Sequence, residues 1–200
     1  MADFGAEVVA ETERLVLRRE QPGDLDVWLE HMNTPEVMAR VGGVQPPEKI
    51  AEAFVKMADG AAESGPSFHY VALKSDGTLI GKCGLSRIDT AVAPDALRNE
   101  IQVGWTLRAD FWGQGYAREA AEAALGLAFD RFGLARVYGQ TSESNVPSWR
   151  LMERLGMRRC AELDYADADY PPEDNPTMIY RLDAAEWQAR AAAGARQAHG

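Results

Sequence analysis

The sequence has little cysteine, little histidine and no long apolar run, and each shortage excludes a class of protein. Cys83 and Cys160 are too few and too far apart for a disulfide framework, so we expect two reduced, buried thiols. His31, His69 and His199 are scattered without partners at ligand spacing, which predicts surface or edge residues and no metal site. No apolar segment approaches the length that crosses a bilayer, so we expect no membrane partner.

Positive charge is also in short supply. Lys and Arg total 21 against 31 Asp and Glu, a formal net charge of -10. Nucleic-acid phosphates are held by clustered Lys and Arg, so this negative net charge argues against a nucleic-acid partner. It is far more compatible with a cationic amine as ligand. Solubility alone also explains such acidity. The first twelve residues lack a basic and then hydrophobic signal, which predicts a cytoplasmic protein.

The length of the chain favours one domain over two. Two hundred residues, 46% of them hydrophobic, suffice for a sizeable core. We expect a single domain over residues 1–200, with its core at about 12–183. The tail at 184–200 is rich in alanine, so we expect it to be partly helical or frayed.

Apolar spacing predicts alternating strands and helices along the first half. Helical periods follow Asp24 and Pro47, and the second helix ends in the region from Gly60 to Gly65. The Asp76-Gly77 step between two apolar runs is a hairpin signal and predicts antiparallel strands on either side. The strands predicted in this half are 13–18, 68–74 and 78–88.

The second half alternates strand and helix more regularly. A polar excursion at 89–98 leads into the run 100–107, which we interpret as the central strand. Alanines at helical spacing then predict a helix over 117–132, stopped by Gly133. The elements predicted after it are a strand at 134–141, a helix from Asn145 that ends before Gly156, and closing strands at 158–163 and 178–182.

One junction in this half points to a ligand. Trp112-Gly113-Gln114-Gly115-Tyr116-Ala117-Arg118 joins the central strand to the alanine-rich helix. Glycine lets backbone approach a ligand closely, and the first N–H groups of a helix have no intrahelical partner, so a phosphate site is one interpretation. The alternative is a plain turn, because most paired glycines are turns.

A second element follows about thirty residues later. Asn145-Val146-Pro147-Ser148 opens a helix that ends at Leu155-Gly156-Met157. The order strand, Gly-x-Gly-x-Ala, helix, strand, Asn-x-x-Ser, helix, Leu-Gly-Met resembles the GNAT N-acetyltransferase superfamily, in particular its RimJ/RimL-like branch, which acetylates ribosomal-protein N-termini and other amines. The stretches 12–18 and 180–183 also resemble that branch, so the resemblance covers nearly the whole chain.

The resemblance implies that acetyl-CoA lies in a cleft between the central strand and the strand after the long helix. Main-chain groups of Trp105 and Leu107 would bind the pantetheine arm, as would the side chain of Asn145, whose alternative role is a helix N-cap. The residues implied to present backbone N–H groups to the pyrophosphate are Gly113, Gln114, Gly115, Tyr116, Ala117 and Arg118.

Transfer of an acetyl group to an amine needs a base, because the amine must lose its proton. Glu100 is the candidate, directly or through a water, and a solvated carboxylate at a strand end is the alternative. Ser148 is implied to assist the thiolate leaving group, or it only caps its helix. The chain departs from the family at three positions: Trp112, where the loop often begins with Gln or Arg; Met152, where many relatives carry a tyrosine acid; and Gln102, where branch members often have Glu.

Together these patterns predict an α/β fold, with a mixed, mostly antiparallel sheet of six or seven strands, helices on both faces and splayed central strands. The predicted activity is acetyl-CoA-dependent N-acetyl transfer to a primary amine, either a protein N-terminus or a small molecule such as a polyamine, amino acid or antibiotic. The alternative from another class is an inactive CoA-binding module. We expect a monomer or homodimer.

Overall fold

The computed structural model describes residues 8–61, 65–168 and 170–197. They fall into two compact units. The first comprises the chain up to Ser86 together with Val103–Ala124, and the second comprises Arg87–Gln102 together with the chain from Leu125 onward.

The first unit is built on antiparallel strands. Each of β2, β3 and β4 pairs with the strand before it, and Leu17 stands opposite Val71 in the register of β2 with β3. Its helical segments are α1 (Asp24–His31), α2 (Pro35–Met38), α3 (Pro47–Ala61), the short turn η3 (Ala109–Phe111) and the start of α4 (Tyr116–Gly126). Its strands are β1 (Val8–Glu11), β2 (Leu15–Arg18), β3 (Phe68–Leu73), β4 (Leu79–Arg87) and most of β5 (Ile101–Leu107).

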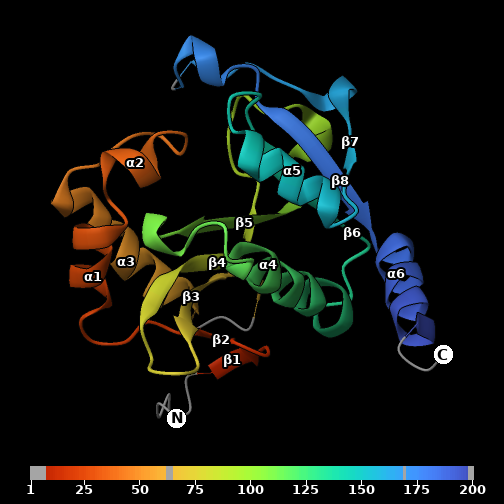
Figure 1. Ribbon diagram of the computed structural model, residues 1–200. Coiled ribbons are helices and arrows are strands. Elements are labelled where there is room, and N and C mark those ends of the chain that lie inside the picture. Colours follow the sequence, from red (N-terminus) through yellow and green to blue (C-terminus); the bar gives the residue numbers. More distant parts are fainter. Residues whose placement is uncertain (1–7, 62–64, 169, 198–200) are drawn as a thin grey trace. The chain divides into compact units, whose positions relative to one another are not determined.

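Helices α1 and α3 cover the strands of this unit with their apolar faces (Figure 1). The helical period predicted from the sequence places Trp28 and Met32 on one face of α1, and both are buried. They pack in one cluster with Phe54 of α3 and with Tyr70 and Leu79 of the sheet. The Trp28 and Phe54 rings meet edge to face, with centroids 6.1 Å apart.

The second unit pairs three strands beside the start of β5. Strand β6 is parallel to β5 at Gln102 and Tyr138 and antiparallel to β8, which also pairs with β7. Ile179 and Tyr138 lie in its core cluster with Ile88, Leu97 and Cys160. Its elements are η2 (Asp95–Leu97), the π-helical segment η4 (Leu127–Arg131), β6 (Arg136–Thr141), α5 (Val146–Arg154), β7 (Arg158–Arg159), η5 (Ala161–Leu163), η6 (Pro172–Asp174), β8 (Met178–Asp183) and α6 (Ala184–Gln197).

The predicted fold class is confirmed as a mixed, mostly antiparallel α/β arrangement with strand order β1-β2-β3-β4-β5-β6-β8-β7. The strand count is eight rather than six or seven, because Val8–Glu11 pairs antiparallel with β2. The strand predicted at 158–163 is only two residues long, since Ala161–Leu163 turns into a 3-10 helix. The helix predicted over 117–132 changes from α to π after Gly126.

The cysteine prediction is confirmed, because Cys83 and Cys160 are both buried and unpaired. One histidine differs from the prediction. His69 is the second residue of β3, stands opposite Cys83 of β4 and is only 7% exposed. His199 lies outside the described residues. Among the described residues, no helix is long and apolar enough to cross a membrane.

Candidate functional site

The junction between η3 and α4 forms an exposed turn, which we call the glycine loop (residues 113–118). Gly113 and Gly115 have φ angles of 74° and 85°, in the left-handed region that side chains disfavour. Glycine is therefore required by the backbone at both positions. A Cβ on Gly113 would meet no atom within 4 Å, so the surface beside it is open.

The backbone donors of the glycine loop are unused. None of the six N–H groups of residues 113–118 donates a hydrogen bond to another described residue, and the ladder of α4 starts when the Glu119 N–H reaches the Gly115 carbonyl at 3.1 Å. Free N–H groups at a helix start carry partial positive charge, which the helix dipole reinforces. The loop is therefore built to receive an anion.

Trp112 fixes the point where the glycine loop begins. Its indole N–H donates to the carbonyl of Leu107 at 2.8 Å, and its backbone N–H donates to the carbonyl of Ala109 at 3.1 Å. The side-chain amide of Gln114 donates to the carbonyl of Asp110 at 3.1 Å. The aromatic residue at this position thus closes the turn between strand and loop. As a consequence, the Leu107 carbonyl already accepts one hydrogen bond within the protein.

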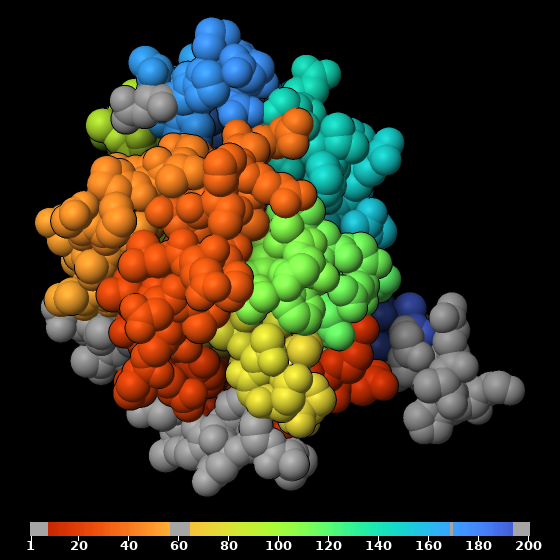
Figure 2. Space-filling view, turned by 60° about the vertical axis from the view of Figure 1, so that its left-hand side comes forward, coloured from red at the N-terminus to blue at the C-terminus, as the bar shows by residue number. Residues whose placement is uncertain are grey.

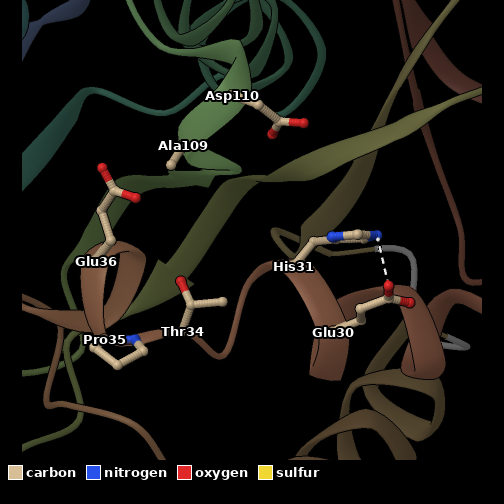
Figure 3. A pocket seen from close by; sticks show the side chains of 7 residues that line it. All are labelled: Glu30, His31, Thr34, Pro35, Glu36, Ala109 and Asp110. Atoms are coloured by element: carbon tan, nitrogen blue, oxygen red, sulfur yellow. Dashed lines mark ion pairs between the residues drawn. The ribbon is translucent and has the colours of Figure 1, made fainter.

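A surface pocket of about 670 Å³ opens next to this turn. Figure 3 shows Glu36 and Asp110 on its two sides, and His31 paired with Glu30 at 3.7 Å. In Figure 2 the red-to-orange helices and the green segment that carries the glycine loop lie beside each other on the face of this unit. The pocket is lined by Glu30, His31, Thr34, Pro35, Glu36, Ala109 and Asp110. Of its three carboxylates, Asp110 forms an ion pair with Arg108 at 2.7 Å, so the negative charge that favours a cation comes from Glu30 and Glu36.

The second unit holds the other predicted binding residues at the start of α5. Asn145 is the N-cap residue of this helix, but its side chain makes no capping hydrogen bond. Its backbone is engaged, because the carbonyl accepts from the N–H groups of Ser148 and Trp149 and the N–H donates to the Ser142 carbonyl. The hydroxyl of Ser148 likewise bonds to no other described residue. Both side chains are half-buried.

Glu100 lies immediately before β5 in the same unit. Its N–H donates to the Leu97 carbonyl at 3.1 Å, and its own carbonyl accepts from the Ile88 N–H at 2.8 Å. The pKa of Arg136 is raised, first by a hydrogen bond with Tyr138 and also by the charge of Glu100. Among the described residues, no hydrogen bond or ion pair joins Glu100 to Asn145 or Ser148.

Met152 has a packing role, which accounts for its departure from the family pattern. It is 2% exposed, and its Sδ and Cε atoms lie 3.0 and 2.9 Å from the place that a Cβ on Gly139 would take. The thioether fills the space above a glycine of β6 and has no proton to donate. If the reaction uses an acid, this position does not supply it.

A buried carboxylate in this unit was missed by the reading of the sequence. Asp174 is 7% exposed, and its Oδ1 accepts from the hydroxyls of Ser144 at 2.5 Å and Ser142 at 3.1 Å. The backbone N–H of Asn145 donates to the Ser142 carbonyl at 3.1 Å. The network therefore holds η6 against the segment that leads into Asn145. An acidic stretch such as 164–176 gives no local signal for this contact.

Comparisons with known proteins agree with this architecture. The family model described as "Acetyltransferase (GNAT) domain" matches residues 14–158. The chain belongs to the GNAT acetyltransferase family. The GNAT family uses acetyl-CoA as its acyl donor, so the chain is an acyltransferase of the N-acetyltransferase class. Among the described residues, no group of three or more His, Cys, Asp or Glu side chains is placed to hold a metal ion.

Two curated relatives of the GNAT chain are 30% identical to it. The uncharacterized N-acetyltransferase YnaD of Bacillus subtilis (strain 168) matches over 149 residues, 74% of this chain and 81% of the relative. The protein named FsC-acetyl coenzyme A-N(2)-transacetylase, from Aspergillus fumigatus, matches over 157 residues, 76% of this chain and 66% of the relative.

Solved GNAT structures share the fold. An acetyltransferase from Agrobacterium tumefaciens str. C58 has a TM-score of 0.71 at 25% identity and covers 91% of this chain and 97% of its own. A putative ribosomal-protein-serine acetyltransferase from Vibrio cholerae has a TM-score of 0.67 at 19% identity, and the match covers 86% of this chain and 95% of the other. The aminoglycoside acetyltransferase AAC(6')-Ib in complex with coenzyme A has a TM-score of 0.71 at 16% identity, and the match covers 88% of this chain and 98% of the other. The last two identities support the fold alone.

Proposed function

We propose that this GNAT protein moves the acetyl group of acetyl-CoA directly to a primary amine and holds the donor's pyrophosphate on the glycine loop. The observation that carries the proposal is the row of six backbone N–H groups without acceptors among the described residues. A pyrophosphate offers negative charge and several acceptor oxygens, which such a row binds. Gly113 and Gly115 leave the approach free of side chains.

The proposed reaction needs one base and releases one thiolate. The neutral amine attacks the acetyl carbonyl carbon; a carbon–nitrogen bond forms, the carbon–sulfur bond breaks, and CoA leaves as the thiolate. We assign the departing amine proton to Glu100, directly or through a water, and stabilisation of the departing thiolate to a hydrogen bond from the Ser148 hydroxyl; the thiolate then takes its proton from water. The unengaged hydroxyl of Ser148 supports the second assignment.

The remaining binding residues are assigned to the pantetheine arm. Asn145 supports this role because its side chain does not cap α5. Trp105 and Leu107 are assigned main-chain contacts with the amides of the arm. For Leu107 we assign the contact to the N–H, because its carbonyl already accepts from the indole of Trp112.

The proposed acceptor is a cationic amine, a protein N-terminus of the kind that RimJ/RimL-like enzymes acetylate. The carboxylates of Glu30 and Glu36 in the pocket beside the loop support a positively charged substrate. A small-molecule amine is the second candidate, favoured by the 30% identity to the Aspergillus transacetylase. A cytoplasmic location and a monomeric or homodimeric state are parts of the same proposal.

The assignment is tested by measuring CoA release from acetyl-CoA with two sets of acceptors. One set contains peptides that begin with Ala or Ser, and the other contains polyamines, amino acids and aminoglycosides. Saturable turnover with peptides is the expected result. Turnover with small amines alone would replace the first acceptor by the second, and CoA binding without any turnover would leave an inactive binding module. Full turnover by a Glu100→Gln variant would show that Glu100 is not the base.

A further inference from the structure

An arginine from the start of the chain reaches across to the glycine loop. The Nη1 of Arg14 donates to the carbonyl of Gln114 at 3.0 Å, and its guanidinium lies over the Tyr116 ring at 4.4 Å. Its Nη2 lies 3.3 Å from the place that a Cβ on Gly115 would take. One planar group thus contacts Gln114 and Tyr116 and lies beside Gly115 between them, all within the first unit.

Glu119, in the first turn of α4, holds this arginine from the other side. Its Oε2 accepts from the Arg14 Nε at 2.7 Å, and its Oε1 accepts from the Arg14 backbone N–H at 2.8 Å and from the Thr12 hydroxyl at 2.5 Å. Burial acts to raise the pKa of Glu119, but these hydrogen bonds and the charge of Arg14 outweigh it and hold the pKa below its usual value. Glu119 is therefore ionised at neutral pH.

We infer that Arg14 is a positioning residue for the acetyl-CoA loop and that Glu119 fixes its guanidinium, an inference that rests on the proposed function. A carbonyl that points toward a pyrophosphate would repel it, and the bond from Arg14 ties the Gln114 carbonyl to the guanidinium. With that carbonyl fixed, the neighbouring N–H groups keep one orientation before the ligand arrives. Preorganised donors lose less free energy on binding than donors that must be ordered.

A role in stability alone does not account for this arrangement. The Arg14 side chain is 43% exposed, and exposed ion pairs contribute little to folding. The guanidinium combines several hydrogen-bond donors, a planar surface that packs on an aromatic ring and a permanent positive charge, a combination that lysine lacks. Loss of Arg14 is therefore expected to alter the loop more than the fold.

The decisive variant is Glu119→Gln, because two explanations predict opposite changes in its affinity for CoA. If only the net charge near the loop matters, removal of a negative charge strengthens the binding of an anion. If Glu119 acts by fixing Arg14, its removal weakens binding. We expect the Kd for CoA, measured by calorimetry, to rise about threefold, since a charged hydrogen bond is replaced by a neutral one.

Arg14 variants complete the experiment. We expect Arg14→Gln to raise the Kd for CoA about tenfold, the size of one lost charge-assisted hydrogen bond, and Arg14→Lys to restore little of it. The KM for acetyl-CoA should rise in parallel, with kcat and the KM for the amine unchanged. Arg98→Gln, at an exposed pair with Asp95 away from the glycine loop, is the control and should leave the Kd within twofold.

The outcomes separate the inference from the proposed function. If the wild-type protein does not bind CoA, the proposed function fails. If the wild type binds CoA and Glu119→Gln binds it equally or more tightly, the positioning role is wrong while the proposed function stands. Full rescue by Arg14→Lys would also overturn the inference, because it would show that charge alone is needed.

Discussion

At the scale of single residues, two glycines of the same loop have different surroundings. Both have positive φ angles, so alanine is strained at either position, by about 1–2 kcal/mol. A Cβ on Gly113 meets nothing within 4 Å, whereas a Cβ on Gly115 approaches Nη2 of Arg14 to 3.3 Å. Gly115 is therefore the position where a methyl group also displaces the guanidinium.

We expect Gly115→Ala to weaken CoA binding more than Gly113→Ala does. Both variants carry the backbone strain, and the extra loss at 115 comes from the shifted arginine, about threefold to tenfold in Kd. Calorimetry with CoA on the two matched variants measures the difference. Equal losses, or a larger loss at Gly113, would show that Arg14 does not act on the loop through this contact.

A second residue, Lys82 of β4, is enclosed by aromatic rings. Its Nζ lies 3.9 Å from the ring centre of Phe54, 4.3 Å from that of Trp28 and 4.6 Å from that of Tyr70. Burial lowers the pKa of Lys82 to about 8, while the charges of Glu20 and Asp24 act to raise it. The ring faces also stabilise the ammonium.

This lysine predicts a specific pH dependence of stability. Between pH 8 and about 10.4 the unfolded chain holds a proton that the folded chain has released, so the free energy of unfolding rises through this window. The rise is at most about 3 kcal/mol and is absent below pH 8. Urea unfolding of the wild type and of Lys82→Met at pH 7 and pH 10 measures it. A stability difference between the two proteins that stays constant with pH would contradict this account.

At the scale of elements, the turn between β5 and α4 depends on one indole. The N–H of Trp112 is bonded to the Leu107 carbonyl, and the side chain is otherwise 47% exposed. Trp112→Phe keeps an aromatic ring but removes this bond. We expect a loss of CoA affinity of about threefold to tenfold, with less than about 1 kcal/mol of stability lost.

The matched control for this element is Trp187→Phe. The ring of Trp187 stacks on Phe129 with centroids 5.8 Å apart, and phenylalanine keeps a stacked ring there. CoA titrations of the two variants separate a loop effect from the general loss of an indole. If both variants bind CoA as the wild type does, the indole of Trp112 does not hold the loop.

The elements that were predictable from sequence are those with local signals. The glycines of the loop, the alanine periodicity of α4 and the Asp76-Gly77 turn each encode their structure within a few residues. Contacts between distant segments left no such signal. Glu119 is 105 residues from Arg14, and Asp174 is 32 residues from Ser142, so neither pair is visible in a local pattern.

At the scale of the whole molecule, both units contain residues that the sequence analysis predicts to take part in acetyl transfer. The glycine loop belongs to the first unit, and Asn145, Ser148 and Glu100 belong to the second. The family, the sheet order and the free N–H groups together support acetyl-CoA as the donor. We assign the acceptor to the pocket beside α1 and α2, whose lining the fold alone does not specify.

The most direct test of the central claim is a titration of the ¹⁵N-labelled protein with CoA, followed through its backbone amide resonances. The account predicts that the amides of residues 113–118 shift first and most strongly, because their N–H groups acquire the pyrophosphate as acceptor. Titration with dephospho-CoA, which keeps the pyrophosphate, should shift the same amides. If CoA binds while these six amides keep their positions, the glycine loop is not the donor site and the account is contradicted.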